Sequence, residues 1–258
     1  MSKLLILFSI CHFAVSAAAQ PKILPEEALP FVPAGYETLD YETGDLNNDQ
    51  KTDAILLLKQ KAEDTLQEDA LRPMLILLRQ SNGKLSMKQR HDSAILCRQC
   101  GGIFGDPYEA TEIKNGSFTI RFYGGSAWRW ASSYTFRYFA AAANWKLHEE
   151  EQVSYHNTDI EKTWKKFNIG ESELGSIFFS QFNINRNFTE QHWRVTATRA
   201  YFYNNPRPGS KHRKGYLVKG DTIITYRTTR NFVQVSYKSA GDTYTEGFML
   251  KSNLEKLQ

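Results

Sequence analysis

Short runs in which apolar and polar residues alternate recur along most of the chain. In Ser117–Tyr123 the apolar residues Phe118, Ile120 and Phe122 alternate with polar ones, which is the two-residue period of a strand with one buried face. The pair Asn115-Gly116, just before this run, is a strong signal for a tight turn. Other runs rich in β-branched, aliphatic or aromatic residues are Met74–Leu78, Tyr134–Tyr138 and Thr222–Tyr226. Long helical periodicity is nearly absent, so the sequence predicts a mainly β fold.

Two stretches interrupt this pattern. Asp159–Phe167 is predicted to form a short helix or a turn, and the acidic stretch Lys61–Ala70 is predicted to form an exposed loop or short helix.

Charge divides the chain into two parts. Residues 21–192 contain 19 Lys and Arg against 24 Asp and Glu, a net of −5, whereas residues 193–258 contain 12 against 4, a net of +8. This break predicts an acidic, β-rich domain over 21–192 and a basic domain over 193–258. The basic surface either only aids solubility or meets an acidic partner, the acidic half of the same chain included.

The first twenty residues have the order of a secretory signal peptide. Lys3 is followed by an apolar stretch from Leu4 to Val15 and then by small residues up to Ala19, near which we expect cleavage. A lipid anchor at Cys11 is disfavoured because Ile10 stands where a small residue is required. No later segment approaches the ~18 apolar residues of a membrane span. We therefore expect a periplasmic or secreted protein without membrane insertion.

The loop Gly44–Asp53 has oxygen-bearing residues at alternate positions. Calcium takes six to eight oxygen ligands, and carboxylates on alternate residues of a tight loop can converge on one ion. The candidate ligands are Asp45, Asn47, Asp49, the backbone carbonyl of Lys51, and Asp53.

The pattern Gly-Asp-Leu-Asn-x-Asp-x-x-x-Asp before an apolar strand resembles the calcium loops of FG-GAP and VCBS repeats. The resemblance implies a calcium cofactor, although Gln50 stands where those loops favour a left-handed glycine. The alternative is a degenerate loop that binds no metal. Those families build propellers from several repeats, and the single repeat found here indicates a loop borrowed into a small β-rich domain.

Cys97 and Cys100 are the two cysteines that follow the signal peptide. In an exported chain such a pair predicts a structural disulfide. The following Gly101-Gly102 favours a turn over the helix N-terminus of a redox-active pair. A redox-active pair and a metal site remain as alternatives.

The stretch Gly124–Trp130 joins two expected strands and places Trp128 and Trp130 around Arg129. Two tryptophans in a groove can stack on a sugar or another flat ligand; alternatively, they close one edge of a β core. Residues 97–145 also resemble exported bacterial proteins of unassigned function that share a CGG-x-FGDP element and a GGS-x-RW element.

Three catalytic signatures are missing from the sequence: the Gly-x-Ser-x-Gly elbow, the His-Glu-x-x-His zinc helix and the Ser-x-x-Lys pair. Asp106 and His91 are the polar groups of interest near the cysteine turn. The sequence gives little support to an enzyme.

The C-terminal sixty or so residues resemble a bacterial Src-homology-3-like domain. The resemblance rests on strand-like segments around Val195–Tyr203, Phe232–Tyr237 and Thr245–Leu250, with a Lys219-Gly220-Asp221 turn. It implies a small barrel that binds peptides in an aromatic-lined groove. The expected ligand-binding residues are Tyr201, Tyr203, Tyr226 and Phe232, with Lys211 and Arg213 in an adjacent exposed loop, and Trp128 and Trp130 in the first domain.

These observations favour a non-catalytic binding protein of the cell envelope whose partner is a cell-wall peptide or an envelope protein, and not a nucleic acid. The first alternative is an inhibitor or immunity-type protein that binds an envelope-active toxin or hydrolase, and an enzyme is the third. The sequence leaves the oligomeric state open.

Overall fold

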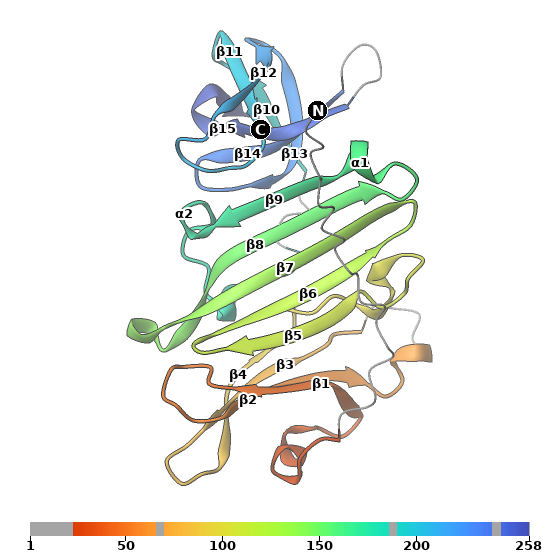
Figure 1. Ribbon diagram of the computed structural model, residues 1–258, viewed down its shortest axis with the longest axis vertical. Coiled ribbons are helices and arrows are strands. Elements are labelled where there is room, and N and C mark those ends of the chain that lie inside the picture. Colours follow the sequence, from red (N-terminus) through yellow and green to blue (C-terminus); the bar gives the residue numbers. More distant parts are fainter. Residues whose placement is uncertain (1–22, 66–69, 186–189, 239–243, 258) are drawn as a thin grey trace, which may run out of the picture.

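The computed structural model describes residues 23–65, 70–185, 190–238 and 244–257. The chain forms three antiparallel β-sheets with short helical turns between strands (Figure 1), which confirms the mainly β prediction. The expected signal peptide lies outside the described residues. No helix in the described part of the chain combines the length and the apolar character that a membrane span requires.

The first sheet, sheet A, has four strands in sequential order. They are β1 (Tyr36–Gly44), β2 (Asp53–Gln60), β3 (Met74–Arg79) and β4 (Leu85–His91). The apolar run of β2 is buried on both faces. On the outer face, Leu56 and Leu58 cluster with Ala28 of the 3-10 turn η1 (Glu26–Phe31). Glu27 of this turn pairs with Arg79 at 2.8 Å.

The second sheet, sheet B, has five strands in sequential order. They are β5 (Tyr108–Lys114), β6 (Ser117–Gly125), β7 (Trp128–Phe139), β8 (Asn144–His156) and β9 (Lys165–Gly170). Phe118, Ile120 and Phe122 are buried, as their alternation predicts. Gly116 in the predicted turn has a φ of +69°, a conformation that glycine adopts without strain.

Sheets A and B share one hydrophobic core. Ile55 and Met74 of sheet A belong to the same buried cluster as Phe118 and Phe136 of sheet B, and Phe179 closes it from the segment after β9. In this core the indole N–H of Trp145 donates to the carbonyl of Leu46 at 2.7 Å. This bond anchors the start of the predicted calcium loop to sheet B.

The connections between strands include two short α-helices and several 3-10 turns. The predicted helical stretch 159–167 contains α1 (Ile160–Thr163), and α2 (Glu171–Leu174) follows β9. The acidic stretch 61–70 contains the 3-10 turn η2 (Glu63–Thr65). Its predicted exposure is wrong at Glu63, which is buried. The remaining turns are η3 (Arg98–Gly101), η4 (Ala140–Ala142), η5 (Phe179–Gln181) and η6 (Lys251–Asn253).

The third sheet, sheet C, has the strand order β12-β11-β15-β14-β13-β10-β16. Its strands are β10 (Gln191–Val195), β11 (Arg199–Tyr203), β12 (His212–Val218), β13 (Thr222–Thr228), β14 (Phe232–Lys238), β15 (Tyr244–Leu250) and β16 (Leu254–Lys256). One face holds its own core, which includes Phe202, Val233 and Met249. Within the described residues no pairing joins β12 to β16, so the sheet does not close into a barrel.

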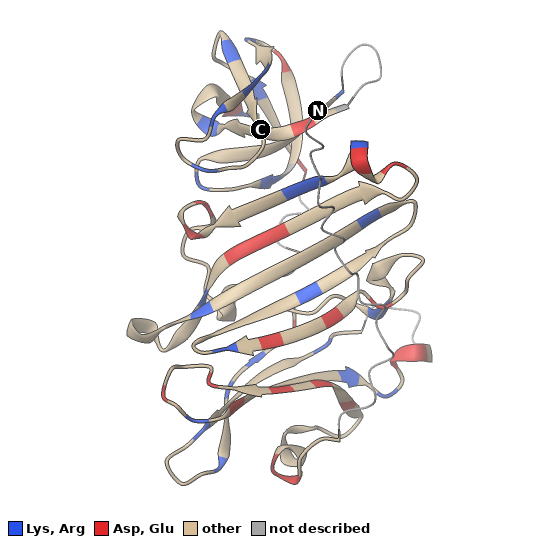
Figure 2. Cartoon of the chain, viewed as in Figure 1, with Lys and Arg blue, Asp and Glu red and all other residues tan. Residues whose placement is uncertain are grey.

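Sheet C coincides closely with the basic part of the sequence. Its first strand begins at Gln191, next to the charge break at residue 192. Lys and Arg outnumber Asp and Glu on this sheet, whereas acidic residues are numerous on the other two (Figure 2).

Candidate functional site

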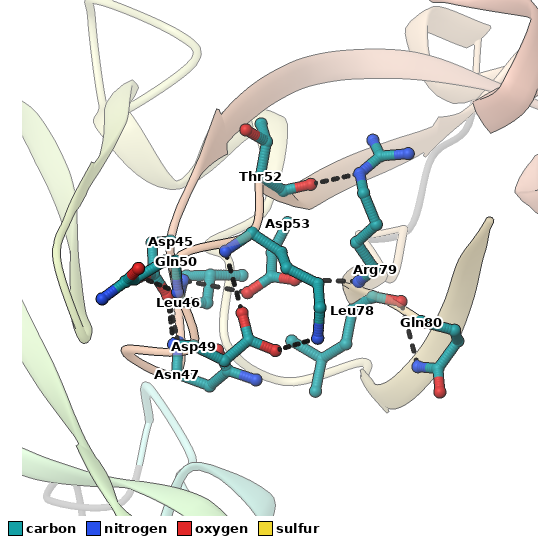
Figure 3. A network of polar contacts seen from close by, with 11 residues as sticks. Asp45, Leu46, Asn47, Asp49, Gln50, Thr52, Asp53, Leu78, Arg79 and Gln80 are labelled. Atoms are coloured by element: carbon teal, nitrogen blue, oxygen red, sulfur yellow. Dashed lines mark hydrogen bonds and ion pairs between the residues drawn. The ribbon is translucent and has the colours of Figure 1, made fainter. Parts of the chain in front are cut away.

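The loop between β1 and β2 brings three carboxylates together. Asp45, Asp49 and Asp53 each offer an oxygen, and these oxygens lie within 4.8 Å of one another (Figure 3). Hard cations such as calcium bind clustered carboxylate oxygens. The three Asp residues that the sequence singles out therefore form an acidic cluster that can hold a metal ion.

Side-chain hydrogen bonds fold this loop tightly. The Asp45 carboxylate accepts the N–H of Asp49 at 3.1 Å and the N–H of Gln50 at 2.8 Å. The side-chain oxygen of Asn47 also accepts the N–H of Asp49, at 3.1 Å. Gln50 has a φ of +65°, so it occupies the left-handed position where the resemblance implies glycine.

Asp53 is the buried member of the acidic cluster. It has no solvent exposure, and it accepts backbone N–H groups from Arg79 at 2.8 Å and Leu46 at 3.0 Å. Burial raises the pKa of Asp53, the two backbone hydrogen bonds oppose this rise, and the nearby charges of Asp49 and Asp45 add to it. A cation at the cluster would oppose this rise in pKa, because it would compensate the negative charge of the buried carboxylate.

Lys51 supplies a positive charge from within the loop. Its ammonium lies 3.0 Å from Oδ2 of Asp49, and its backbone N–H donates to Oδ1 of the same carboxylate at 3.0 Å. Desolvation raises the pKa of Asp49, but the hydrogen bonds with Lys51 and Asn47 outweigh it and lower the pKa. A metal ion at the cluster would compete with the Lys51 ammonium.

Cys97 and Cys100 form a disulfide, with their Cα atoms 5.2 Å apart. Cys100 belongs to η3, a single 3-10 turn rather than an α-helix. The pair therefore lacks the long helix whose N-terminus activates a redox cysteine. The disulfide is confirmed as a feature of a turn.

Next to this turn lies an ionic cluster that the sequence analysis missed. The guanidinium of Arg72, which is fully buried, binds the carboxylates of Glu63 and Asp106 with contacts of 2.7 to 2.9 Å. Asp106 is thus a structural partner of Arg72. His91 packs its ring against Phe179 at 5.0 Å, and burial lowers its pKa.

The two tryptophans of the Trp128–Trp130 stretch lie in different environments. Trp128 is 51% exposed and contacts the ring of His156 edge-on at 5.2 Å, whereas Trp130 packs against the shared core of sheets A and B. The guanidinium of Arg129 lies over the ring of Phe104 at 3.9 Å. The structure therefore does not bring the two tryptophans together around Arg129.

The ligand-binding residues predicted on sheet C differ in burial. Tyr201 and Tyr203 are half-buried on one face of β11, but Phe232 is 1% exposed and belongs to an internal cluster. Phe232 nevertheless meets the ring of Tyr203 edge-on at 5.4 Å, and both residues line a hollow of about 360 Å³ beside Arg207 and Pro208. The side chain of Tyr226 lies outside the described residues.

The two basic residues predicted beside the groove differ in exposure. Lys211 is exposed, whereas Arg213 is half-buried and donates from Nε to the side-chain oxygen of Asn204 at 2.6 Å. Burial lowers the pKa of Arg213.

A surface cluster on β11 and β12, here called the aromatic strip, comprises Arg199, Tyr201, His212 and Tyr216. Tyr201 stacks on His212 at 4.0 Å and meets Tyr216 at 5.5 Å, and Arg199 lies over the Tyr216 ring at 4.8 Å. Except for the half-buried Tyr201, these side chains are exposed. Of the four, only Tyr201 is expected from the sequence, because the pairing of β11 with β12 decides the others.

One face of sheet C packs against sheet B. Phe232 and Phe248 cluster with Ile169 of β9, and Phe248 meets Phe167 edge-on at 5.2 Å. The carboxylate of Glu173 accepts hydrogen bonds from the Thr229 hydroxyl at 2.8 Å and from the Asn231 side chain at 2.7 Å. The acidic and basic parts of the chain are thus in contact through apolar and polar groups.

The basic loop 204–214 also reaches sheet B. Arg207 and Pro208 line a hollow of about 370 Å³ together with His148, Glu149 and Glu171. Part of the basic charge therefore faces the acidic half of the same chain, as one of the alternatives from the sequence expects.

No family model, curated protein or solved structure matches this chain.

Proposed function

We propose that this chain is an exported, non-catalytic binding protein of the cell envelope, and that the aromatic strip is its contact surface for cell-wall peptide. The observation that carries this proposal is the contact of Tyr201 with two exposed rings: Tyr201 stacks on His212 and meets Tyr216 edge-on. With Arg199 over the Tyr216 ring, these side chains form a preordered platform rich in Tyr and Arg, two residue types that dominate binding energies. The platform adjoins Tyr203, another residue that the Src-homology-3-like resemblance implies for ligand binding, because the Tyr203 ring meets His212 edge-on at 6.2 Å.

The position of the platform also supports a peptide ligand. Strand β12 is at the edge of sheet C and pairs with β11 alone within the described residues. An extended peptide can add to such an edge through backbone hydrogen bonds while its side chains contact the neighbouring rings.

We also infer that the acidic cluster binds calcium. Its donor set consists of carboxylate oxygens from Asp45, Asp49 and Asp53. Oxygen donors suit a hard cation such as calcium, whereas zinc prefers nitrogen and sulfur donors. Bound calcium would supply positive charge beside the buried Asp53. Its role is to stabilise the junction of β1 and β2, not to take part in a reaction.

Sedimentation with purified cell-wall sacculi tests the binding function. The mature chain should pellet with sacculi, and Tyr201→Ala and Tyr216→Ala should each leave more protein in the supernatant. Tyr155→Ala is a matched control, because Tyr155, on β8 of sheet B, also takes part in a ring stack, with Trp164.

The salt dependence of pelleting separates the two kinds of contact. Charge reversal at Lys211 should act mainly at low salt, because the Debye length falls from ~10 Å at 0.1 M to ~3 Å at 1 M. Tyr201→Ala should weaken pelleting at every salt concentration. A wild-type chain that stays in the supernatant contradicts the peptidoglycan ligand and favours an envelope protein as the partner.

A further inference from the structure

A cleft of about 620 Å³ lies between sheets B and C. One wall is formed by Trp130 and Ser132 of β7, Gln152 and Ser154 of β8, and Phe167 of β9. The other wall comes mainly from β13 and β14 and includes Thr225, Arg227, Gln234 and Ser236. Its volume falls within the ~300–1,000 Å³ of small-molecule sites.

The face of sheet B changes character where it enters this cleft. Along β7, residues 130, 132, 134 and 136 lie on one face; Phe136 belongs to the shared core, whereas Ser132 lines the cleft. The cross-strand partner of Ser132 is Gln152, and that of Trp130 is Ser154. A face that served only for packing would continue the apolar pattern, so its polar residues need another explanation.

Several of these polar groups are available to a ligand. The side chains of Ser132, Ser154 and Gln234 make no hydrogen bond within the described residues. Hydroxyl and carboxamide groups both donate and accept hydrogen bonds. Such groups match a ligand that itself carries hydroxyl or amide groups.

The charged groups of the cleft are already compensated. Arg227 pairs with Glu150, and both side chains are buried. Glu246, at the side of the cleft, pairs with Lys165 at 2.7 Å. The cleft therefore presents no unpaired charge among its described residues, and an ionic ligand would have to displace an existing partner.

We propose that this cleft binds a neutral saccharide. The rings of Trp130 and Phe167 provide apolar surface for the C–H faces of a sugar, and Ser132, Ser154 and Gln234 provide partners for its hydroxyl groups. This site lies apart from the aromatic strip, so the two surfaces can be tested independently.

Calorimetric titration of the mature chain tests this site. The probes are maltotriose and the trisaccharide of N-acetylglucosamine, both neutral, with trigalacturonic acid as the charged comparison. We expect saturable binding of at least one neutral probe and a weaker response to the acid. Ser132→Ala and Gln234→Ala should each raise Kd about fivefold, the equivalent of one lost hydrogen bond of ~1 kcal/mol.

Ser133→Ala is the matched control for Ser132→Ala. It is the next residue of β7, it faces the opposite side of the sheet, and its substitution removes the same hydroxyl group. Ser133→Ala and Tyr201→Ala should leave saccharide binding unchanged, and thermal melts should show that all four variants are folded. Absence of saturable binding to both neutral probes, preference for the acid, or equal losses in Ser132→Ala and Ser133→Ala would overturn the proposal.

Discussion

Glu150 and Arg227 form an ion pair that joins β8 of sheet B to β13 of sheet C, with only 1% and 7% of their side chains exposed. Because both charges are buried, removing one leaves the other without compensation. We expect Arg227→Met to lower the free energy of unfolding by ~3–5 kcal/mol. The double variant Glu150→Leu/Arg227→Met should lie much closer to the wild type. Urea denaturation of the four proteins in this cycle measures both effects.

The neighbouring pair Lys166–Glu151 is the control for that experiment. It joins the adjacent strands β8 and β9 within sheet B, and its side chains are 50% and 35% exposed. Its double-mutant cycle should yield at most ~1 kcal/mol. Equal coupling energies in the two cycles would show that burial does not strengthen the coupling between Glu150 and Arg227.

Calcium should raise the melting temperature of the chelator-treated protein. An ion that binds only the folded state adds about 2.7 kcal/mol at a hundredfold excess over Kd. Asp49→Ala should abolish the shift, whereas Lys51→Ala should increase calcium affinity because it removes a competing ammonium.

Asp92→Ala is the control for the calcium experiment. Asp92 is also an exposed acid in an ion pair, with Arg90 at 2.8 Å, but it lies outside the acidic cluster. Its substitution should leave the calcium shift intact. A melting temperature that millimolar calcium does not change would refute the metal site.

His91 should make the protein less stable in mild acid. Burial lowers its folded-state pKa below the ordinary ~6.5, so below pH ~6.5 the unfolded state binds more protons than the folded state. The free energy of unfolding should therefore fall as the pH drops from ~6.5 to the lowered pKa, and His91→Asn should remove this part of the slope. NMR titration of the His91 ring protons, assigned by their loss in the variant, should give a midpoint below 6.5.

The Cys97–Cys100 disulfide should be structural. It closes a short loop, so its loss in Cys97→Ser/Cys100→Ser should cost at or below the low end of the usual ~2–4 kcal/mol. Mass spectrometry should show two hydrogens fewer in the non-reduced protein than in the reduced one. Efficient turnover in an insulin reduction assay would instead support the redox-active alternative.

Local patterns in the sequence are sufficient to predict several features of the fold. The alternation around Phe118 identifies β6, and the spacing of Asp45, Asp49 and Asp53 identifies the acidic cluster. These predictions succeed because they depend on residues within one strand or one loop, where the backbone period fixes which side chains share a face.

Contacts between distant segments could not be predicted in this way. The two-residue period of β14 places Phe232 on the opposite face of the strand from the residues next to it in the sequence. It does not reveal that β9 covers the face on which Phe232 lies. Likewise, Arg72 meets Asp106 across 34 positions of sequence, and no local pattern marks such a pair. The cleft between sheets B and C could not be predicted for the same reason, because its walls come from strands of two different sheets.

The η1 turn covers sheet A and thereby protects the folded chain from aggregation. Ala28 and its neighbours Leu24, Phe31 and Val32 protect an aliphatic face that contains Leu56 and Leu58. A segment this short can detach without unfolding the sheet. Detachment would expose a continuous apolar surface, which promotes aggregation. An N-terminal fusion, or a signal peptide that is not removed, could strain this segment. Such a change should lower the yield of soluble protein even where the stability of the core is unchanged.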